Sequence, residues 1–442
     1  MRRIGKSLST FSRKSIPDAF VFALLLTILV YGFGILFTDH GPFQLIQDWY
    51  GGFWNLLTFS MQMVLILVTG YALASAPVVE RLMTWLACIP RNGPQGVALV
   101  GLVAGLLGCL NWGLSLIAGA LLARKVAISA QARGIKLHYP LAAAAGYLGQ
   151  LIWHGGLSGS APLLMNTQGH FLEASIGIVP LSETIFRPFN LIVSLGILTI
   201  TPLVLMSMHP GEEDVEEMDQ YESVRAKALD SDRTEPKNRF GNNRILVGIV
   251  CIASLFFLAN FFWQHGLASL DLNIINFTLL TLGLLLHGTP ARYTKAVEGG
   301  ARAASGVILQ FPFYAGIMGI MTSSGLASVI AHWFVTISTP LSYPFWTLLS
   351  AGLINLMVPS GGGQWAIQGP IVVEATQVLG VDVGRSIMAV SFGDELTNMI
   401  QPFWVLPLLG ITRLRAGDVL GYTAVTMMVA FLIMTLGITF LP

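Results

Sequence analysis

Long apolar runs dominate this chain of 442 residues. A helix needs about 20 mostly apolar residues to cross the hydrocarbon core of a bilayer. The stretches that meet this length are 18–38, 53–76, 139–165, 184–208, 245–264, 271–288, 303–325, 385–411 and 419–441. Only 11% of the residues are charged, against about 25% in soluble domains, which excludes a water-soluble surface. We therefore predict an all-α polytopic membrane protein with about nine full spans.

The same composition excludes several other classes of protein. The formal net charge of +1 offers no basic face to nucleic acid. The three cysteines lie in apolar segments and do not form a disulfide framework. An integral membrane enzyme is disfavoured, because the chain has no His-Glu-x-x-His, paired-Cys or Gly-x-Ser-x-Gly motif.

Lys and Arg mark one side of the predicted topology. If the nine spans cross and the two broken apolar stretches 95–123 and 341–380 return to the side they enter, all but two of the 24 basic residues face the same side. The exceptions are Arg187 and Arg385. The positive-inside rule makes that side cytoplasmic, so we predict a cytoplasmic N-terminus and an external C-terminus.

The chain contains an internal repeat. Gln62 and Trp85 match Gln310 and Trp333 at an offset of 248 residues. Further matches in the same order pair 104–107 with 351–354, Gly146 with Gly393, and 162–164 with 407–409. Five spans separate the two starts, so the second repeat is predicted to be inverted, as in secondary transporters.

These observations predict a domain organisation. The first inverted repeat covers 1–208, with a re-entrant helical hairpin at about 95–123 and an interrupted span at about 139–165. A charged cytoplasmic linker at 209–244 and a connecting span at 245–264 follow. The second repeat covers 265–442, with a hairpin at about 341–380 and an interrupted span at about 385–411.

The hairpins turn at 109–115 and 358–365, where Asn, Gly and Pro interrupt the apolar sequence. Non-helical backbone at membrane depth must line a cavity or be buried in protein, and its free N–H groups suit an anion. The interrupted spans break at 153–162 and 393–402. The predicted substrate-binding residues are Asn111, Trp112, Gly113, Ser115, His154, Ser158, Ser160, Ser360, Gly361, Gly362, Gly363, Gln364, Trp365, Thr397, Asn398 and Gln401.

A coupling cation is expected at the same breaks. Asp394 and Glu395 lie in or near a span, where a charged residue costs at least about 2.5–3.5 kcal/mol and is functional by default. We predict Asp394, Glu395, Asn398 and Asn111 as cation ligands, with Na⁺ or H⁺ as the ion and no other cofactor or metal. Because no Lys or Arg falls within the breaks, neutral donors and a co-bound cation would hold an anion, which favours a small monocarboxylate.

Four segments of the chain are distinctive: NWGLSLIAGALLAR, WHGGLSGSAPLLMNT, PSGGGQWAIQGP and SFGDELTNMIQPFWVLPLLGI. They resemble the bacterial short-chain fatty acid transporter family, associated with acetoacetate and butyrate uptake. The resemblance covers essentially the whole chain. It implies a two-hairpin carrier of the wider ion-transporter group, homodimeric in the inner membrane, whose transport domain moves as an elevator. The Ser-Asn-Thr tips of related dicarboxylate carriers are absent here; the nearest elements are Asn111 with Ser115, and Ser360 with the glycines.

Alternatives remain at this stage. The same scaffold suits a carrier of another organic anion or a cation/proton antiporter. A passive channel fits the paired hairpins less well.

Overall fold

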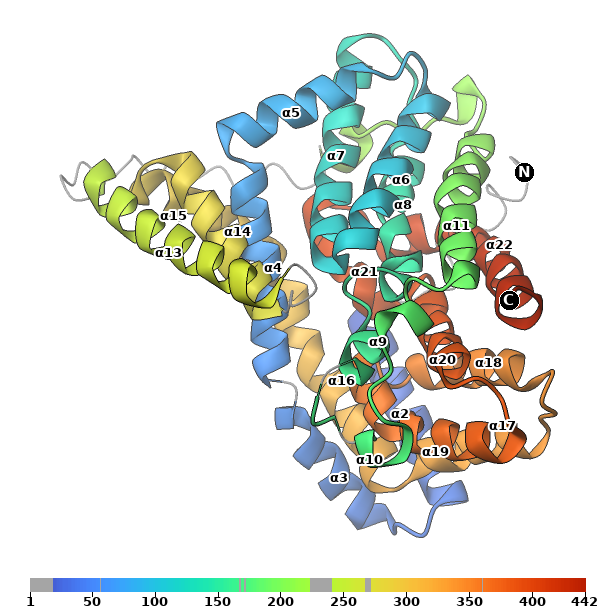
Figure 1. Cartoon of the computed structure of the whole chain (residues 1–442). Helices are drawn as coiled ribbons and strands as arrows, with labels where there is room; N and C mark the ends of the chain where they lie inside the picture. The colour runs from blue at the N-terminus through green and yellow to red at the C-terminus, as the bar shows by residue number, and fades with distance from the viewer. Residues whose placement is uncertain are drawn as a thin grey trace.

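The computed structural model describes residues 19–55, 57–166, 168–170, 172–222, 241–266, 272–359 and 361–442. Within these ranges all regular elements are helices, which confirms the all-α prediction. In Figure 1, α13–α15 lie with α4 at one side of the molecule. The helices α6–α8 and α11 form a second group, and α16–α20 lie with α2 and α3 in a third (Figure 1).

The helices of the first half and the middle are α2 (Ala19–Phe37), α3 (Pro42–Asn55), α4 (Leu57–Ala74), α5 (Pro77–Cys88), α6 (Gly93–Leu110), α7 (Trp112–Ala132), α8 (Tyr139–Gly146), η1 (Leu148–Leu151), η2 (Trp153–Gly155), α9 (Ser160–Met165), α10 (Glu173–Ile176), η3 (Leu181–Glu183), α11 (Pro188–Ser207), η4 (Glu212–Asp214), α12 (Asp219–Glu222) and α13 (Arg244–His265). The second half contains α14 (Leu272–His287), α15 (Pro290–Ala303), α16 (Ser305–Ser323), α17 (Leu326–Thr336), α18 (Tyr343–Asn355), α19 (Gly361–Leu379), α20 (Val383–Asn398), α21 (Pro402–Thr412) and α22 (Ala416–Phe440).

The order of helices from α2 to α11 recurs from α14 to α22. In each half a long helix is followed by a 14-residue helix, α3 or α15. A sharply bent pair comes next: the α4–α5 bend is 69° and the α16–α17 bend is 66°. The bent pairs contain the matched residues Gln62 and Gln310, so the repeat seen in the sequence is also a repeat of elements.

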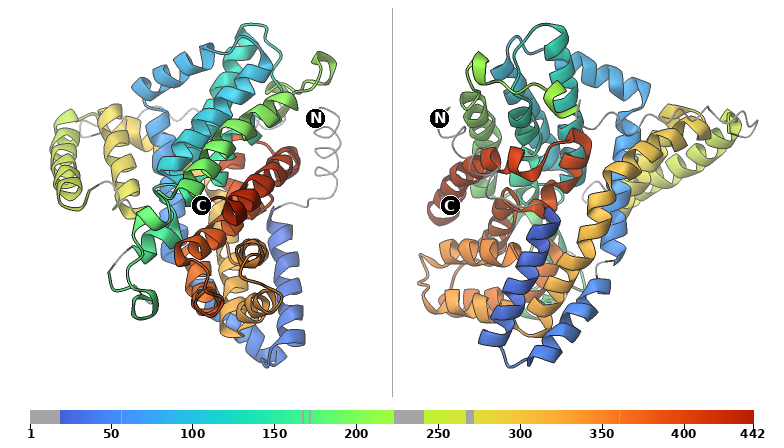
Figure 2. Two further views of the ribbon diagram at one scale, coloured as in Figure 1. Left: turned by 45° about the vertical axis from the view of Figure 1, so that its right-hand side comes forward. Right: turned by 180° about the vertical axis from the view of Figure 1, so that it is seen from behind.

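Glycine pairs set how the two halves cross. Gly51 and Gly52 in α3 stand 248 positions before Gly299 and Gly300 in α15. A Cβ on Gly52 would lie 2.5 Å from the backbone oxygen of Ala315 in α16, and one on Gly300 would lie 2.8 Å from the Cα of Val68 in α4. Thus α3 packs on α16 and α15 packs on α4, each helix crossing the bent pair of the other half at close range. Figure 2 shows α16 between α2 and α3 from behind.

Each hairpin consists of two packed helices with a short tip. Between α6 and α7 the tip is Asn111 alone, whose extended backbone ends one helix and begins the next. In the second hairpin α18 ends at Asn355 and α19 begins at Gly361. The predicted turn at 358–365 is therefore too long, because Gly361–Gly363 form the first turn of α19. Ser360 lies outside the described residues.

Both predicted interruptions are present, with different extents. The stretch 139–165 is divided into α8, η1, η2 and α9. The second break comprises only Met399–Gln401, between α20 and α21. Asp394 and Glu395 consequently lie in the last two turns of α20 rather than in the break.

Six described helices are long and apolar enough to cross a membrane, or up to eight if each bent pair is one span. The total of nine spans and two hairpins stays a prediction. Two predicted loops are largely helical, since α5 occupies most of 77–94 and α15 most of 289–302. Both helices begin with Pro in the first turn, and each is too short to register as a span of about 20 residues.

Candidate functional site

A buried polar cluster forms where the first interrupted span meets the end of α20. His154 Nε2 lies 3.0 Å from Asp394 Oδ1, and the two side chains are 1% and 2% exposed. The residues are 240 positions apart in the chain. We use "polar cluster" for His154, Asn355, Asp394, Glu395, Asn398 and Gln401.

The hydrogen bonds of His154 fix the position of its proton. The backbone N–H of Ser160 donates to His154 Nδ1 across 3.3 Å. Because an N–H can only donate, Nδ1 accepts and the proton sits on Nε2, from which it is donated to Asp394. Since Ser160 is the first residue of α9, the imidazole ties the start of α9 to α20.

Glu395 satisfies backbone groups that the break sets free. Its Oε2 accepts the backbone N–H of His154 at 2.8 Å. Short 3-10 segments leave such N–H groups without helical partners. Glu395 thus holds η2 in place, whereas Asp394 Oδ2 has no hydrogen-bond partner.

The amide side chains of the cluster have defined orientations. Asn355 Nδ2 donates to the Asp394 carbonyl oxygen and to Asn398 Oδ1, both at 2.7 Å. Gln401 Nε2 donates to the Asn355 carbonyl oxygen at 3.0 Å. These bonds leave Asn355 Oδ1 and Gln401 Oε1 as acceptors and Asn398 Nδ2 as a donor, all buried and without partners.

Hydrogen bonds also fix the amide orientation of two glutamines, Gln150 and Gln364. Gln150 Nε2 donates to the Trp112 carbonyl oxygen at 3.2 Å, and Gln364 Nε2 donates to the Ala351 carbonyl oxygen at 2.9 Å. Each amide leaves its oxygen unpartnered. The unpartnered buried atoms around the breaks include Gln150 Oε1, Trp153 Nε1, Asn355 Oδ1, Gln364 Oε1, Asp394 Oδ2, Asn398 Nδ2, Gln401 Oε1 and Trp404 Nε1.

Several predicted residues of the first hairpin are instead engaged within the protein. Asn111 Oδ1 accepts the N–H groups of Gly113 and Leu114 at 2.9 and 3.0 Å and so caps α7. Ser115 Oγ donates to the Ala104 carbonyl oxygen at 2.6 Å. The matched carbonyl of the second hairpin, Ala351, is the one that Gln364 binds, so both hairpins are closed by the same contact.

Other predicted residues have structural contacts too. Ser158 Oγ accepts the backbone N–H of Trp112 at 3.2 Å. Thr397 Oγ1 donates to the Gly352 carbonyl oxygen at 3.0 Å. Trp112 packs in the main apolar core, whereas Trp365 belongs to a separate apolar cluster with Ala161, so the structure does not bring these two indoles together.

The glycines at the start of α19 lie against the polar cluster. A Cβ on Gly361 would be 2.5 Å from His154 Cε1 and 3.0 Å from Ser160 Oγ, whereas one on Gly362 would meet nothing within 4 Å. The tip of the second hairpin therefore covers the His154–Asp394 pair, and only a residue without a side chain fits at Gly361.

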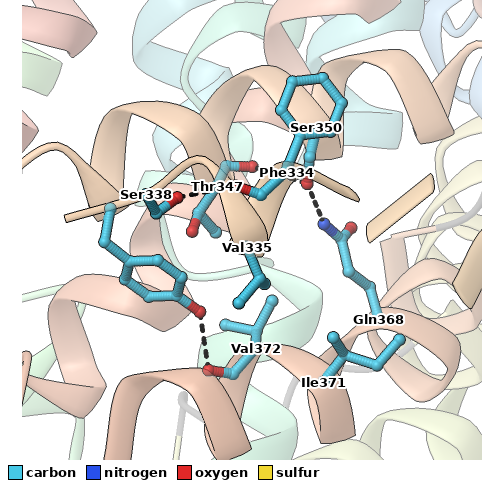
Figure 3. A pocket seen from close by; sticks show the side chains of 9 residues that line it. Phe334, Val335, Ser338, Thr347, Ser350, Gln368, Ile371 and Val372 are labelled. Atoms are coloured by element: carbon cyan, nitrogen blue, oxygen red, sulfur yellow. Dashed lines mark hydrogen bonds between the residues drawn. The ribbon is translucent and has the colours of Figure 1, made fainter. Parts of the chain in front are cut away.

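A small pocket lies elsewhere, between α17, α18 and α19. In Figure 3, Gln368 points to Ser350, and the distance from Nε2 to Oγ is 2.6 Å. Gln368 Oε1 in turn accepts from Gln364 at 3.1 Å. A hydrogen bond from Gln364 to Gln368 thus connects the pocket lining to the start of α19. No member of the polar cluster lines the pocket.

The site is acidic, and no Lys or Arg belongs to the polar cluster. The segments 95–123, 139–165 and 341–380 contain no Lys or Arg, and the segment 385–411 contains only Arg385, at its first residue. Sequence reasoning missed Asn355, Gln150 and Gln368, which sit inside helices that read as apolar. The available signal was a polar amide within an apolar run, since such groups are costly in a membrane and mark functional positions.

Comparison with known proteins decides the family. The model of the family described as "Short chain fatty acid transporter" matches residues 1–441. The chain belongs to this family. The resemblance found in the sequence is thereby confirmed.

Two curated relatives share the full length. One from Escherichia coli (strain K12) is 39% identical over 441 residues, and one from Haemophilus influenzae is 36% identical over 451 residues. Each alignment covers 99% of both chains, and both relatives carry the name "Putative short-chain fatty acid transporter". Among solved structures, the chain is similar to the Alcanivorax borkumensis YdaH transporter, with a TM-score of 0.45, 17% identity, and coverage of 96% of this chain and 97% of the other.

Proposed function

We propose that this protein is a secondary active transporter of small monocarboxylates of the acetoacetate and butyrate type, driven by a coupled cation. The observation that carries the proposal is the set of buried, unpartnered donors and acceptors where the hairpin tip meets the two broken spans. Buried polar atoms without partners are rare in native proteins and call for a ligand or a functional explanation.

The absence of Lys and Arg from the two hairpins and the two breaks is the argument for the charge of the substrate. A single carboxylate is held by neutral N–H donors together with a bound cation. A di- or tricarboxylate would bring a second charge into a buried, acidic site with no cationic side chain to pair it, at a cost of several kcal/mol. The proposal therefore favours monocarboxylates.

The coupling cation is placed on the oxygens left open around the end of α20. Asp394 Oδ2, Asn355 Oδ1 and Gln401 Oε1 are buried acceptors without partners, and oxygens at a helix break are typical ligands of a coupling ion. Of the cation ligands predicted from sequence, Asn111 and Glu395 already accept backbone N–H groups, and Asn398 Oδ1 accepts from Asn355 Nδ2. The proposal accordingly retains Asp394 and adds Asn355 and Gln401.

Uptake by proteoliposomes tests both the substrate class and the coupling to a cation. Labelled butyrate and acetoacetate are offered under an inward Na⁺ gradient at equal pH, an inward H⁺ gradient without Na⁺, and no gradient, with succinate and citrate as charge controls. Accumulation above equilibrium under one gradient is expected, and its identity names the coupling ion. Uptake of no carboxylate under any condition refutes the substrate class, and equilibration without accumulation indicates a passive channel.

A comparison of accumulation with exchange tests Asp394 as a ligand of the coupling cation. Asp394→Asn is expected to abolish gradient-driven accumulation while retaining exchange of labelled for unlabelled butyrate, since the amide keeps the shape but removes the charge that the cation neutralises. Accumulation at the wild-type level in this variant would contradict the cation assignment.

We also propose a homodimer in the bacterial inner membrane, with a cytoplasmic N-terminus, a periplasmic C-terminus and an elevator-like transport domain holding both hairpins. Hydrogen bonds across the polar cluster join the second hairpin to α20 and α20 to the first broken span, which supports movement as one body. Labelling by a membrane-impermeant thiol reagent in intact cells tests the topology: Pro442→Cys is expected to react and Glu212→Cys to stay protected.

A further inference from the structure

Two tryptophans that the sequence did not single out as ligands flank the breaks. Trp153 begins η2 in the first interrupted span, and Trp404 lies in the first turn of α21, just after the second break. Both side chains are 2% exposed. Their indole Nε1 atoms are buried and have no hydrogen-bond partner. An indole N–H is a donor only, and a buried tryptophan usually finds a partner for it.

The two indoles lie close together within one aromatic group. Their ring centroids are 6.2 Å apart, and Trp112 packs against both, at 6.0 Å from Trp153 and 5.3 Å from Trp404. A carboxylate bridges two donor nitrogens up to roughly 8 Å apart, two N–H···O distances of about 2.9 Å plus its own width. Ring centroids 6.2 Å apart make the two indoles direct neighbours, which a shared carboxylate requires, and the aromatic faces suit a short alkyl chain.

A third donor belongs to the same region. Asn398 is the last residue of α20, six positions before Trp404. Its oxygen accepts from Asn355, so its Nδ2 faces no acceptor. The unpartnered atoms named around the breaks thus divide by chemistry. Trp153, Trp404 and Asn398 offer donors, while the acceptors are side-chain oxygens of Gln150, Asn355, Gln364, Asp394 and Gln401.

We infer that Trp153 and Trp404 form the carboxylate subsite, in which the two indole N–H groups bind the carboxylate oxygens of a short-chain acid and Asn398 supports them. This inference rests on the proposed function. It assigns to neutral indole N–H groups the binding of a carboxylate, for which arginine is the usual cationic partner. Neutral donors are compatible with the neighbouring carboxylates because they add no charge that would pair with Asp394 or Glu395.

Binding measured on the full-length protein in detergent tests the inference. Dissociation constants for acetate, propionate and butyrate are determined by calorimetry for the wild type, Trp153→Phe and Trp404→Phe. Phenylalanine keeps the aromatic packing and removes the N–H. Because a hydrogen bond to a charged group is lost, we expect each variant to bind roughly ten- to hundredfold more weakly.

A matched control comes from Trp49 in α3. Its Nε1 is also buried without a partner, and it packs against Phe53 and Phe313, with centroids at 4.4 and 6.1 Å. Trp49→Phe is expected to bind all three acids as the wild type does. The Trp49→Phe variant therefore shows how far removal of an unpartnered indole N–H outside the site changes the dissociation constants. Melting temperatures identify any variant that fails to fold.

The dependence on chain length separates the carboxylate role from packing. If the indoles bind the carboxylate, the fold-loss is equal for acetate, propionate and butyrate. A loss that grows with chain length would show that they only pack against the alkyl chain and would overturn the inference, as would wild-type affinity in both variants. A wild-type protein that binds no short-chain acid would refute the proposed function itself, and the subsite with it.

Discussion

Replacing Gly361 by alanine perturbs the closest contact between the second hairpin and the polar cluster. The new Cβ would lie 2.5 Å from His154 Cε1, 2.8 Å from His154 Nε2 and 3.0 Å from Ser160 Oγ. These separations are far inside the 3.5–4.0 Å at which carbon atoms are comfortable. The imidazole cannot turn aside, because both ring nitrogens and its backbone N–H are hydrogen-bonded.

The expected cost follows from the size of the clash. Overpacking a well-packed site by one methyl group costs typically 1–3 kcal/mol. We expect the cost to weaken closure of the tip over His154. That corresponds to a rise in the KM for butyrate uptake of about 5- to 150-fold, with a smaller effect on the melting temperature.

Gly362→Ala is the matched control. It makes the same chemical change one residue later in the first turn of α19, and its Cβ would meet nothing within 4 Å. Both substitutions gain similar helix propensity, up to about 1 kcal/mol, so their difference reports the contact with His154. Equal KM values for the two variants, in proteoliposomes with matched protein content, would refute the view that the tip covers the His154–Asp394 pair.

Three further substitutions test contacts that shape the fold, each by thermal melting in detergent. Gly52→Ala places a Cβ 2.5 Å from the Ala315 carbonyl oxygen and is expected to cost about 1–3 kcal/mol of stability. Gly51→Ala, whose Cβ would meet nothing within 4 Å, should leave the stability unchanged. Equal losses of stability in the two variants would contradict the close crossing of α3 and α16. Arg385→Ala removes two bonds of 2.7 Å to carbonyl oxygens at the end of α22 and should cost about 1.5–3 kcal/mol; an unchanged melting temperature would show that water replaces them. Asn111→Ala removes the cap of α7 and should cost about 0.5–2 kcal/mol, which Asn111→Ser should largely restore.

Local features of the sequence made much of the fold predictable. Apolar runs, scarce charge and the distribution of Lys and Arg depend only on how residues partition between water and lipid. Glycine, proline and asparagine break helices through their own backbone and side-chain preferences, so the hairpin tip at Asn111 and the break before Pro402 could be located. The two bent pairs stand at the repeated positions that Gln62 and Gln310 mark.

The extents of these features were less predictable, because tertiary contacts decide them. The helices α5 and α15 lie in predicted loops, since a short helix is stabilised by the face it packs rather than by its length. The glycines 361–363 were expected to form a turn, yet they are helical, and only Gly361 packs against His154.

The sequence by itself determined the class of protein, its repeat, and the residue types available to bind an anion and a cation. Only the tertiary structure decided which of their atoms remain open. Asn111, Ser115 and Glu395 are engaged by nearby or distant backbone groups, whereas Asp394 and Asn398 retain one free atom each. The reason is physical: a polar atom in a dry interior is satisfied by whichever partner the fold delivers, and for His154 and Asp394 that partner lies 240 residues away.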